Sequence, residues 1–205
     1  MSKGKRITEK IMAHFRKVDR VIYRVMIKTD LRLPEIEAPA NYFTKLCREI
    51  VGQQLASKAA NAIFTRFVNL FPNQKITPEK IIKVPDQKLR DTGLSWAKVK
   101  YVKDLAQKVR NREVVIDNLN NLDDEAVALE LIKVKGIGPW TAEMFLIFTL
   151  GRENVFSPGD LALKKALIRL YDLKVDPSQK EISQIVDKWT PYKTYGSLTL
   201  WSIFD

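Results

Sequence analysis

The 205-residue sequence has very few residues of the kinds that form cross-links or bind metals, with one cysteine, Cys47, and one histidine, His14. A single thiol cannot form an internal disulfide, a cysteine-rich zinc site or a four-cysteine iron–sulfur cluster. Cys47 lies among Phe43, Leu46 and Ile50, which predicts a buried, unreactive thiol. No cluster of histidine, cysteine and acidic residues has the spacing of a divalent-metal site, so we expect no such metal.

Long apolar segments are also missing from the sequence. It contains neither a secretory apolar region nor the run of about twenty apolar residues that crosses a membrane. We therefore expect a soluble, intracellular protein with no membrane partner. The compartment would be the cytoplasm or nucleoid, or the nucleus if the source is eukaryotic.

Acidic residues are in the minority, because 24 Asp and Glu stand against 35 Lys and Arg and leave a formal net charge of +11. This balance favours a polyanionic partner, and a nucleic acid before a membrane. For any one basic cluster, a solvated helix face is an equally good explanation. The clusters are Lys3, Lys5 and Arg6; Lys98, Lys100, Lys103, Lys108, Arg110 and Arg112; and Lys164, Lys165 and Arg169.

The alternation typical of strands is almost absent, and apolar residues recur at helical spacing instead. Residues 7–27, for example, place Ile11, Phe15, Val18 and Ile22 on one face, before a break from Leu33-Pro34 to Pro39. These patterns predict an all-α fold, in which the lysines of 93–109 face outward and the apolar segment 141–150 is central. The other predicted helices are 42–51, 57–71, 78–82, 86–92, 123–132, 160–171, 178–188 and 192–203.

The segment Gly136-Ile137-Gly138-Pro139 predicts a tight turn that opens onto a helix. Pro139 suits the first helical position, and glycine allows another backbone to come close. The N–H groups and the dipole of a helix start form an anion site, and Lys133 and Lys135 flank it. The turn is therefore a candidate phosphate-binding site, although a plain helix start would have the same pattern.

A single acidic residue follows the next turn, Ser157-Pro158-Gly159-Asp160, at the start of another predicted helix. The step of 24 residues from Gly136 (160 − 136) leaves room for one helix and a return to the same surface. Asp160 is thus a candidate for a charged group beside the glycine turn. The alternative is that Asp160 only caps its helix.

Together these segments resemble the helix-hairpin-helix (HhH-GPD) superfamily of DNA base-excision glycosylases, and within it the 3-methyladenine DNA glycosylases of type II. The resemblance rests on the glycine hairpin and the turn that ends at Asp160, and extends from about residue 42 to the C-terminus. Two further segments contribute to it, Ile50-Val51-Gly52-Gln53-Gln54-Leu55-Ala56-Ser57 and Trp189-Thr190-Pro191-Tyr192-Lys193-Thr194-Tyr195-Gly196 with Trp201. It implies two helical lobes, 1–41 plus 153–205 and 42–152, with double-stranded DNA bound in a cleft between them.

The resemblance implies that Asp160 is the catalytic residue. Cleavage of an N-glycosidic bond builds positive charge on the sugar, and an ionised carboxylate stabilises that charge or orients the attacking water. Relatives that also cut the strand have a lysine nucleophile where this chain has Trp140, and tryptophan cannot form a Schiff base. Lys133 and Lys135 precede the turn, outside that position. We therefore expect base removal by water without strand cleavage.

The resemblance also assigns the residues that hold the extruded nucleotide. Gln54, next to Gln53, would fill the gap left in the duplex, or both are plain surface residues. Aromatic faces would stack on a cationic methylated purine, although core packing is an equal alternative for each of them. The base-pocket candidates are Trp140, Met144, Trp201 and Tyr192, with Trp96 as a further one, and Met144 replaces a tyrosine of bacterial relatives.

The backbone of the DNA would be gripped by Gly136 and Gly138 with Lys133, Lys135 and Lys164. No cofactor is expected, except for a monovalent cation on the carbonyl groups of Val134 and Ile137 when DNA is bound. The expected function is that of a monomeric, monofunctional glycosylase for alkylated purines of the 3-methyladenine and 7-methylguanine type. The alternatives are a glycosylase for 8-oxoguanine, uracil or hypoxanthine, and a non-catalytic DNA-binding protein.

Overall fold

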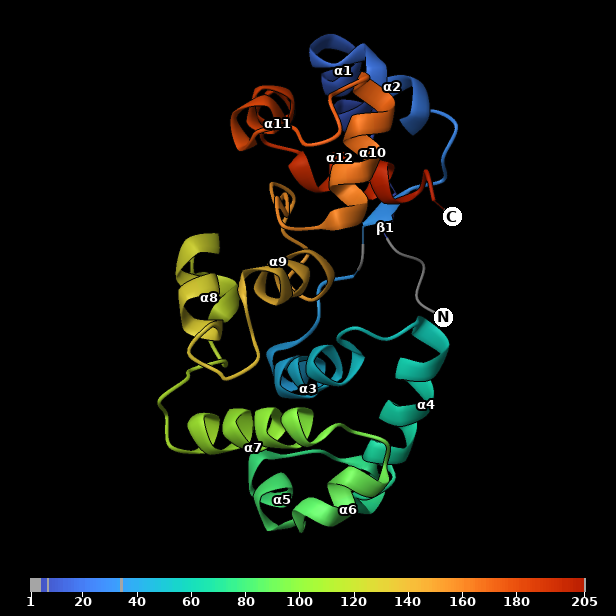
Figure 1. Cartoon of the computed structure of the whole chain (residues 1–205). Helices are drawn as coiled ribbons and strands as arrows, with labels where there is room; N and C mark the ends of the chain where they lie inside the picture. The colour runs from blue at the N-terminus through green and yellow to red at the C-terminus, as the bar shows by residue number, and fades with distance from the viewer. Residues whose placement is uncertain (1–4, 7, 34, 205) are drawn as a thin grey trace. The chain divides into compact units, whose positions relative to one another are not determined.

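The computed structural model describes residues 5–6, 8–33 and 35–204, so Lys3, Ile7 and Pro34 of the sequence analysis lie outside the described residues. The regular secondary structure of the described residues is helical apart from one short antiparallel ladder, in which β1 (Lys5–Arg6) pairs with β2 (Arg32–Leu33). This confirms the predicted all-α fold (Figure 1). The α-helices are α1 (Glu9–Val18), α2 (Arg20–Met26), α3 (Tyr42–Gly52), α4 (Ser57–Val68), α5 (Pro78–Lys83), α6 (Asp86–Asp91), α7 (Trp96–Arg110), α8 (Asp124–Leu131), α9 (Pro139–Phe148), α10 (Leu161–Tyr171), α11 (Gln179–Val186) and α12 (Lys193–Trp201).

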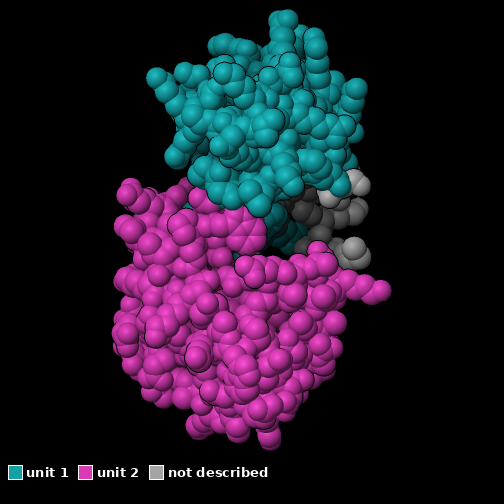
Figure 2. All heavy atoms as spheres, in the orientation of Figure 1, with its two compact units in different colours: residues 1–36, 146–205 teal, residues 37–145 magenta. Residues whose placement is uncertain are grey.

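The chain divides into two compact units, which Figure 2 distinguishes by colour. Unit 1 comprises residues 1–36 and 146–205, and unit 2 comprises residues 37–145. The boundaries expected from the sequence, 41/42 and 152/153, lie a few residues further along the chain. Helix α9 contains the second change of unit. None of the described helices is both long enough and apolar enough to span a membrane.

The first predicted helix is divided in the structure, because the backbone of Asp19 is extended (φ −154°, ψ 93°) between α1 and α2. Asp19 is 8 % exposed, and its Oδ1 accepts hydrogen bonds from the N–H groups of Val21 and Ile22 at 3.0 and 3.3 Å. Its Oδ2 accepts from Tyr171 Oη at 2.7 Å and from Trp189 Nε1 at 2.8 Å. One carboxylate therefore joins α2 to the end of α10 and to the buried indole at the centre of unit 1.

Unit 2 is organised around α7, which packs against α3, α5 and α6 (Figure 1). Val99, Val102 and Leu105 are buried and Val109 is half-buried. Three lysines of α7, however, do not point outward as the sequence predicts. Lys98 donates to the carbonyl groups of Val51 and Gln53, at 2.8 and 2.6 Å. The other two donate in the same way, Lys103 to Ile82 and Val84 and Lys108 to Lys133.

These lysines were predicted to be solvated because a helical periodicity reports only which positions are apolar. In the folded unit each ammonium group lies where a neighbouring helix ends and leaves carbonyl groups without intrahelical partners. A positive charge is also favourable at a helix C-terminus. Three positive charges of the chain are therefore used to join helices within unit 2.

Two other expectations concern the core. The thiol of Cys47 is buried, as predicted, and burial raises its pKa well above the ordinary range. Helix α9 is largely buried, with no exposed surface at Ala142, Phe145 and Ile147, whereas Trp140 and Phe148 are 40 % and 38 % exposed. The apolar segment is therefore central, as predicted, with one aromatic ring exposed near each end of the helix.

The contacts of Asp19 predict a large loss of stability in Asp19→Ala. This change leaves the buried indole N–H of Trp189 and the phenol of Tyr171 without an acceptor, and removes the cap of α2. We expect the free energy of unfolding in urea to fall by about 3 kcal/mol. Tyr171→Phe, which removes one donor and leaves the carboxylate its other partners, should cost about 1 kcal/mol. A loss below about 1 kcal/mol in Asp19→Ala would contradict this role.

Candidate functional site

The glycine hairpin connects α8 to α9 and is held in place by α7. Gly136 has a φ of +84°, and a Cβ atom at this position would lie 2.2 Å from Cδ2 of Tyr101. The backbone N–H of Lys135 donates to Asp104 Oδ2 at 2.8 Å, and Lys108 both donates to the carbonyl of Lys133 and pairs with Asp104 at 3.0 Å. Glycine is therefore required at 136 for two independent reasons, its backbone conformation and the adjacent phenol ring.

Gly138 differs from Gly136, because a Cβ atom there would have no other atom within 4 Å. Its carbonyl accepts from the N–H of Ala142 at 3.0 Å, and Pro139 occupies the first position of α9. The fold itself therefore leaves open space at Gly138. A helix of ten residues begins at this point, and its positive end favours an anion.

The lysines of the hairpin differ in their contacts. Lys133 Nζ lies 2.5 Å from Glu130 Oε2, whereas Lys135 Nζ is 3.9 Å from Asp104 Oδ1 and its side chain is 74 % exposed. Between them the side chain of Val134 is buried, as is that of Ile137 beyond Gly136. The N–H of Ile137 donates to the carbonyl of Val134 at 3.1 Å. The described residues contain no group of three or more His, Cys, Asp or Glu side chains that could hold a metal ion.

A second turn, Gly52-Gln53-Gln54 at the end of α3, contacts the hairpin directly. Gln53 Nε2 donates to the carbonyl of Gly136 at 2.8 Å and to Thr141 Oγ1 at 3.1 Å. Lys98 holds the backbone of the same turn, and burial lowers the pKa of this lysine. The side chain of Gln54 is exposed, on a backbone with a φ of +57°. The two glutamines therefore have different environments, because only Gln53 is directed at the hairpin.

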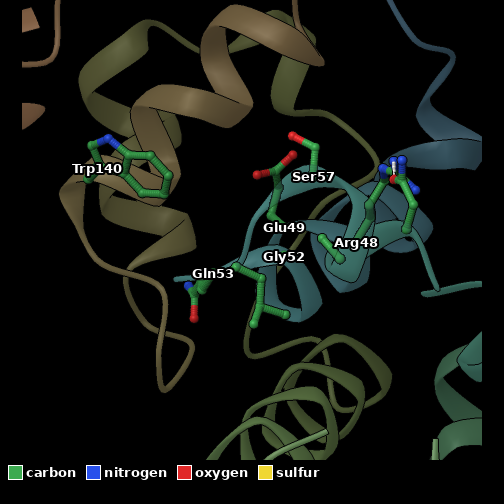
Figure 3. A pocket seen from close by; sticks show the side chains of 9 residues that line it. Arg48, Glu49, Gly52, Gln53, Ser57 and Trp140 are labelled. Atoms are coloured by element: carbon green, nitrogen blue, oxygen red, sulfur yellow. Dashed lines mark hydrogen bonds between the residues drawn. The ribbon is translucent and has the colours of Figure 1, made fainter. Parts of the chain in front are cut away.

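Two hollows flank this contact between the turns. One, of about 400 Å³, is lined by residues that include Gln53, Gln54, Tyr101 and Trp140. The other, of about 210 Å³, lies among Glu49, Gln53, Ser57 and Trp140, and we call it the Glu49 pocket. Figure 3 shows the ring of Trp140 at one side of this pocket and the carboxyl end of Glu49 directed toward the space between them.

Asp160 belongs to unit 1 and is the N-cap of α10. Its Oδ1 accepts from the N–H of Leu163 at 2.9 Å and from Trp201 Nε1 at 3.3 Å, and its own N–H donates to the carbonyl of Ser157 at 3.2 Å. The ring of Trp201 lies against that of Phe148, with centroids 5.7 Å apart. Asp160 is thus a helix cap and also the partner of a predicted base-pocket residue, and the side chain is only half-buried.

The remaining predicted pocket residues lie in varied surroundings. Met144 is buried, at 5 % exposure, and Trp96 is 52 % exposed at the start of α7. Tyr192 is 8 % exposed in the core of unit 1, where its ring meets His14 edge-to-face at 5.2 Å. This placement matches the core-packing alternative for Tyr192. Lys164, predicted to bind the DNA backbone, pairs with the exposed Asp176 at 2.5 Å, and this contact lowers the pKa of Asp176.

The structure therefore brings together two groups of predicted site residues. Unit 2 joins Gln53, Gln54, Gly136 and Trp140, and unit 1 joins Asp160 to Trp201. Sequence reasoning missed the residues that position them. One signal for them is a polar stripe on one face of α7, where polar residues recur every three or four positions at Lys98, Tyr101, Asp104 and Lys108. This spacing could have predicted a helix face that contacts other polar groups. Phe148 and Glu49, by contrast, gave no signal in the sequence.

The chain is similar to proteins of known family. The family model described as "HhH-GPD superfamily base excision DNA repair protein" matches residues 47–192. A DNA-3-methyladenine glycosylase of Schizosaccharomyces pombe is 32 % identical over 161 residues, which are 78 % of this chain and 71 % of that protein. A relative from Bacillus subtilis is 35 % identical over 158 residues, 74 % of this chain and 55 % of its own length. The chain thus spans about half the length of that relative.

Solved structures show the same fold. The 3-methyladenine DNA glycosylase of Schizosaccharomyces pombe, solved in complex with abasic DNA, superimposes with a TM-score of 0.77 at 29 % identity, covering 94 % of this chain and 95 % of that one. The family match includes the hairpin, both glutamines and Asp160, which are the elements that this structure organises. The chain is therefore a member of the HhH-GPD superfamily of base-excision DNA repair proteins.

Proposed function

We propose that the chain is a monofunctional DNA glycosylase that removes alkylated purines of the 3-methyladenine and 7-methylguanine type. The observation that carries this proposal is the carboxylate of Asp160, held by the start of α10 and by the indole of Trp201. The relative of Schizosaccharomyces pombe named above, a DNA-3-methyladenine glycosylase, supports the substrate class. Double-stranded DNA with a damaged base is the proposed partner.

The proposed chemistry needs a negative charge whose position is fixed. As the N-glycosidic bond breaks, positive charge develops on the sugar, and the carboxylate of Asp160 stabilises it and directs a water molecule to the anomeric carbon. The hydrogen bonds from Leu163 and Trp201 orient the carboxylate before DNA binds. Such preorganisation is effective because the group needs no rearrangement during the reaction.

The hairpin and the glutamine turn supply the proposed grip on DNA. A phosphate approaches the open space at Gly138 and the positive start of α9, with Lys135 nearby. Gln54 is the better candidate for the gap left by the extruded base, because the amide of Gln53 already bonds to Gly136 and Thr141. With DNA bound, the carbonyl groups of Val134 and Ile137 would hold a monovalent cation, since a carbonyl oxygen that accepts one hydrogen bond keeps a second lone pair.

The first test replaces Asp160 by asparagine, which also caps helices well and so preserves the start of α10. We expect release of 7-methylguanine from a defined duplex to fall at least about 10²-fold, because the charge that stabilises the sugar is lost. Affinity for the duplex should be unchanged or higher, since one negative charge facing phosphates is removed. Equal base release by the variant and the parent protein would refute the catalytic role. Release of 8-oxoguanine or uracil alone would instead show a different lesion class.

The second test concerns strand cleavage. Trp140 occupies the hairpin position at which a lyase needs an amine, so the enzyme should leave the sugar–phosphate chain intact after base release. We expect duplex with 7-methylguanine to be cut only after alkali treatment, and borohydride to trap no covalent complex. Trapping of the protein on DNA would contradict the proposal, and Lys133 and Lys135 would then be the candidates for the amine nucleophile.

The third test compares the two glycines of the hairpin. Gly138→Ala places a methyl group in the open space proposed for the phosphate, so affinity for duplex DNA should fall about tenfold while the free energy of unfolding changes by about 1 kcal/mol or less. Gly136→Ala should lower the free energy of unfolding by about 2 kcal/mol or more, because of its positive φ and the ring of Tyr101. Unchanged DNA affinity in Gly138→Ala would exclude a phosphate contact there.

A further inference from the structure

The Glu49 pocket belongs entirely to unit 2, where it lies between the end of α3, the start of α4 and the first turn of α9. Its volume of about 210 Å³ is below the roughly 300–1,000 Å³ of pockets for drug-sized ligands and suits a single ring system. The ring of Trp140, which is 40 % exposed, supplies a flat apolar wall (Figure 3). Trp140 also lines the larger hollow beside the hairpin, so both hollows adjoin the proposed DNA grip.

Glu49 brings an acidic group into this pocket. Among the described residues its carboxyl group has no hydrogen bond or ion pair. The neighbouring Arg48 contacts other groups instead. It donates to Asn61 Oδ1 at 2.5 Å, and its guanidinium group lies 5.1 Å from the ring centroid of Phe64. Lys45, the other cation nearby on α3, pairs with Glu37 at 2.6 Å. The acid therefore faces the pocket without a neutralising partner.

These surroundings favour the protonated form of Glu49. Burial raises its pKa, and the charges of Arg48 and Lys45 only partly oppose this. The residues that line the pocket from α4 and α9, namely Ser57, Ala60, Asn61 and Trp140, do not ionise under ordinary conditions. A half-buried carboxyl group that accepts no hydrogen bond and pairs with no cation is suited to donate a proton.

We propose that the carboxyl group of Glu49 donates a proton to a ring nitrogen of an extruded purine stacked on Trp140, which extends base release to purines that carry no positive charge. This inference rests on the proposed glycosylase function. An alkylated purine that is already cationic leaves without such help. An uncharged purine is a poor leaving group and gains most from a general acid.

The proton moves from Glu49 to the ring nitrogen, the bond between the anomeric carbon and the base breaks with both electrons going to the base, and the base departs neutral. Water adds to the anomeric carbon and releases its surplus proton to solvent, and Glu49 regains a proton from solvent. The net reaction consumes one water molecule and needs no other reactant.

The experiment compares Glu49→Gln with the parent protein on two otherwise identical duplexes, one with hypoxanthine and one with 7-methylguanine, in single turnovers between about pH 5 and 9. We expect the variant to lose hypoxanthine release by about 10²-fold or more and to keep 7-methylguanine release within about threefold. In the parent protein, hypoxanthine release should fall as the pH rises and Glu49 loses its proton. This pH dependence should be absent from the variant.

Two controls accompany the comparison. Glu79→Gln removes one exposed carboxylate from α5 of the same unit and should alter neither rate. The melting temperature of Glu49→Gln should equal or exceed that of the parent protein, because a half-buried acid without a partner is removed.

The outcomes separate this inference from the function on which it rests. Equal loss of both activities in Glu49→Gln, no loss of either, or release of 7-methylguanine but never of hypoxanthine by the parent protein would each overturn the role of Glu49. The last of these would leave the glycosylase function standing. A parent protein that released no methylated purine would overturn both proposals.

Discussion

Most of the candidate site in unit 2 depends on one helix face, the polar stripe of α7. Lys98 satisfies the carbonyl groups at the end of α3, and Tyr101 fills the space that a side chain at 136 would need. Asp104 and Lys108 fix the hairpin backbone at Lys135 and Lys133, just before Gly136. Both turns proposed to meet DNA are thus positioned by one rigid element. The hydrogen bond from Gln53 to Gly136 then joins the two turns to each other.

Two aspartates of unit 1 have similar local structure but different proposed roles. Asp19 and Asp160 are both N-caps that accept an indole N–H, from Trp189 and Trp201 respectively. Asp19 is buried. The burial of Tyr171, together with the hydrogen bond from its phenol to Asp19, raises the pKa of that tyrosine. Asp160 is half-buried and begins its helix after a turn. The difference in exposure, and not the capping geometry, separates a residue that stabilises the core from one that can meet a substrate.

Much of this arrangement is predictable from the sequence because it follows from local rules. Helical periodicity gives the all-α fold, Gly-x-Gly-Pro gives the hairpin, and Pro-Gly-Asp gives the cap of α10. The division between α1 and α2 was not predicted, because Asp19 is held at this break also by Tyr171 and Trp189, which are far away in the sequence. The hydrogen bonds of the α7 lysines were not predicted for the same reason, because their acceptors are carbonyl groups at the ends of other helices. The environments of Glu49 and Tyr192 likewise depend on tertiary packing.

The lysines that end on backbone carbonyl groups also change how the charge of this protein should be counted. Lys98, Lys103 and Lys108 belong to the basic segment that suggests a polyanionic partner, yet their ammonium groups donate to backbone carbonyl groups of unit 2. Only cations that meet phosphates displace condensed counterions from a duplex. The formal charge of +11 therefore overstates the number of ions released when DNA binds, and affinity should depend on ionic strength less steeply than composition alone implies.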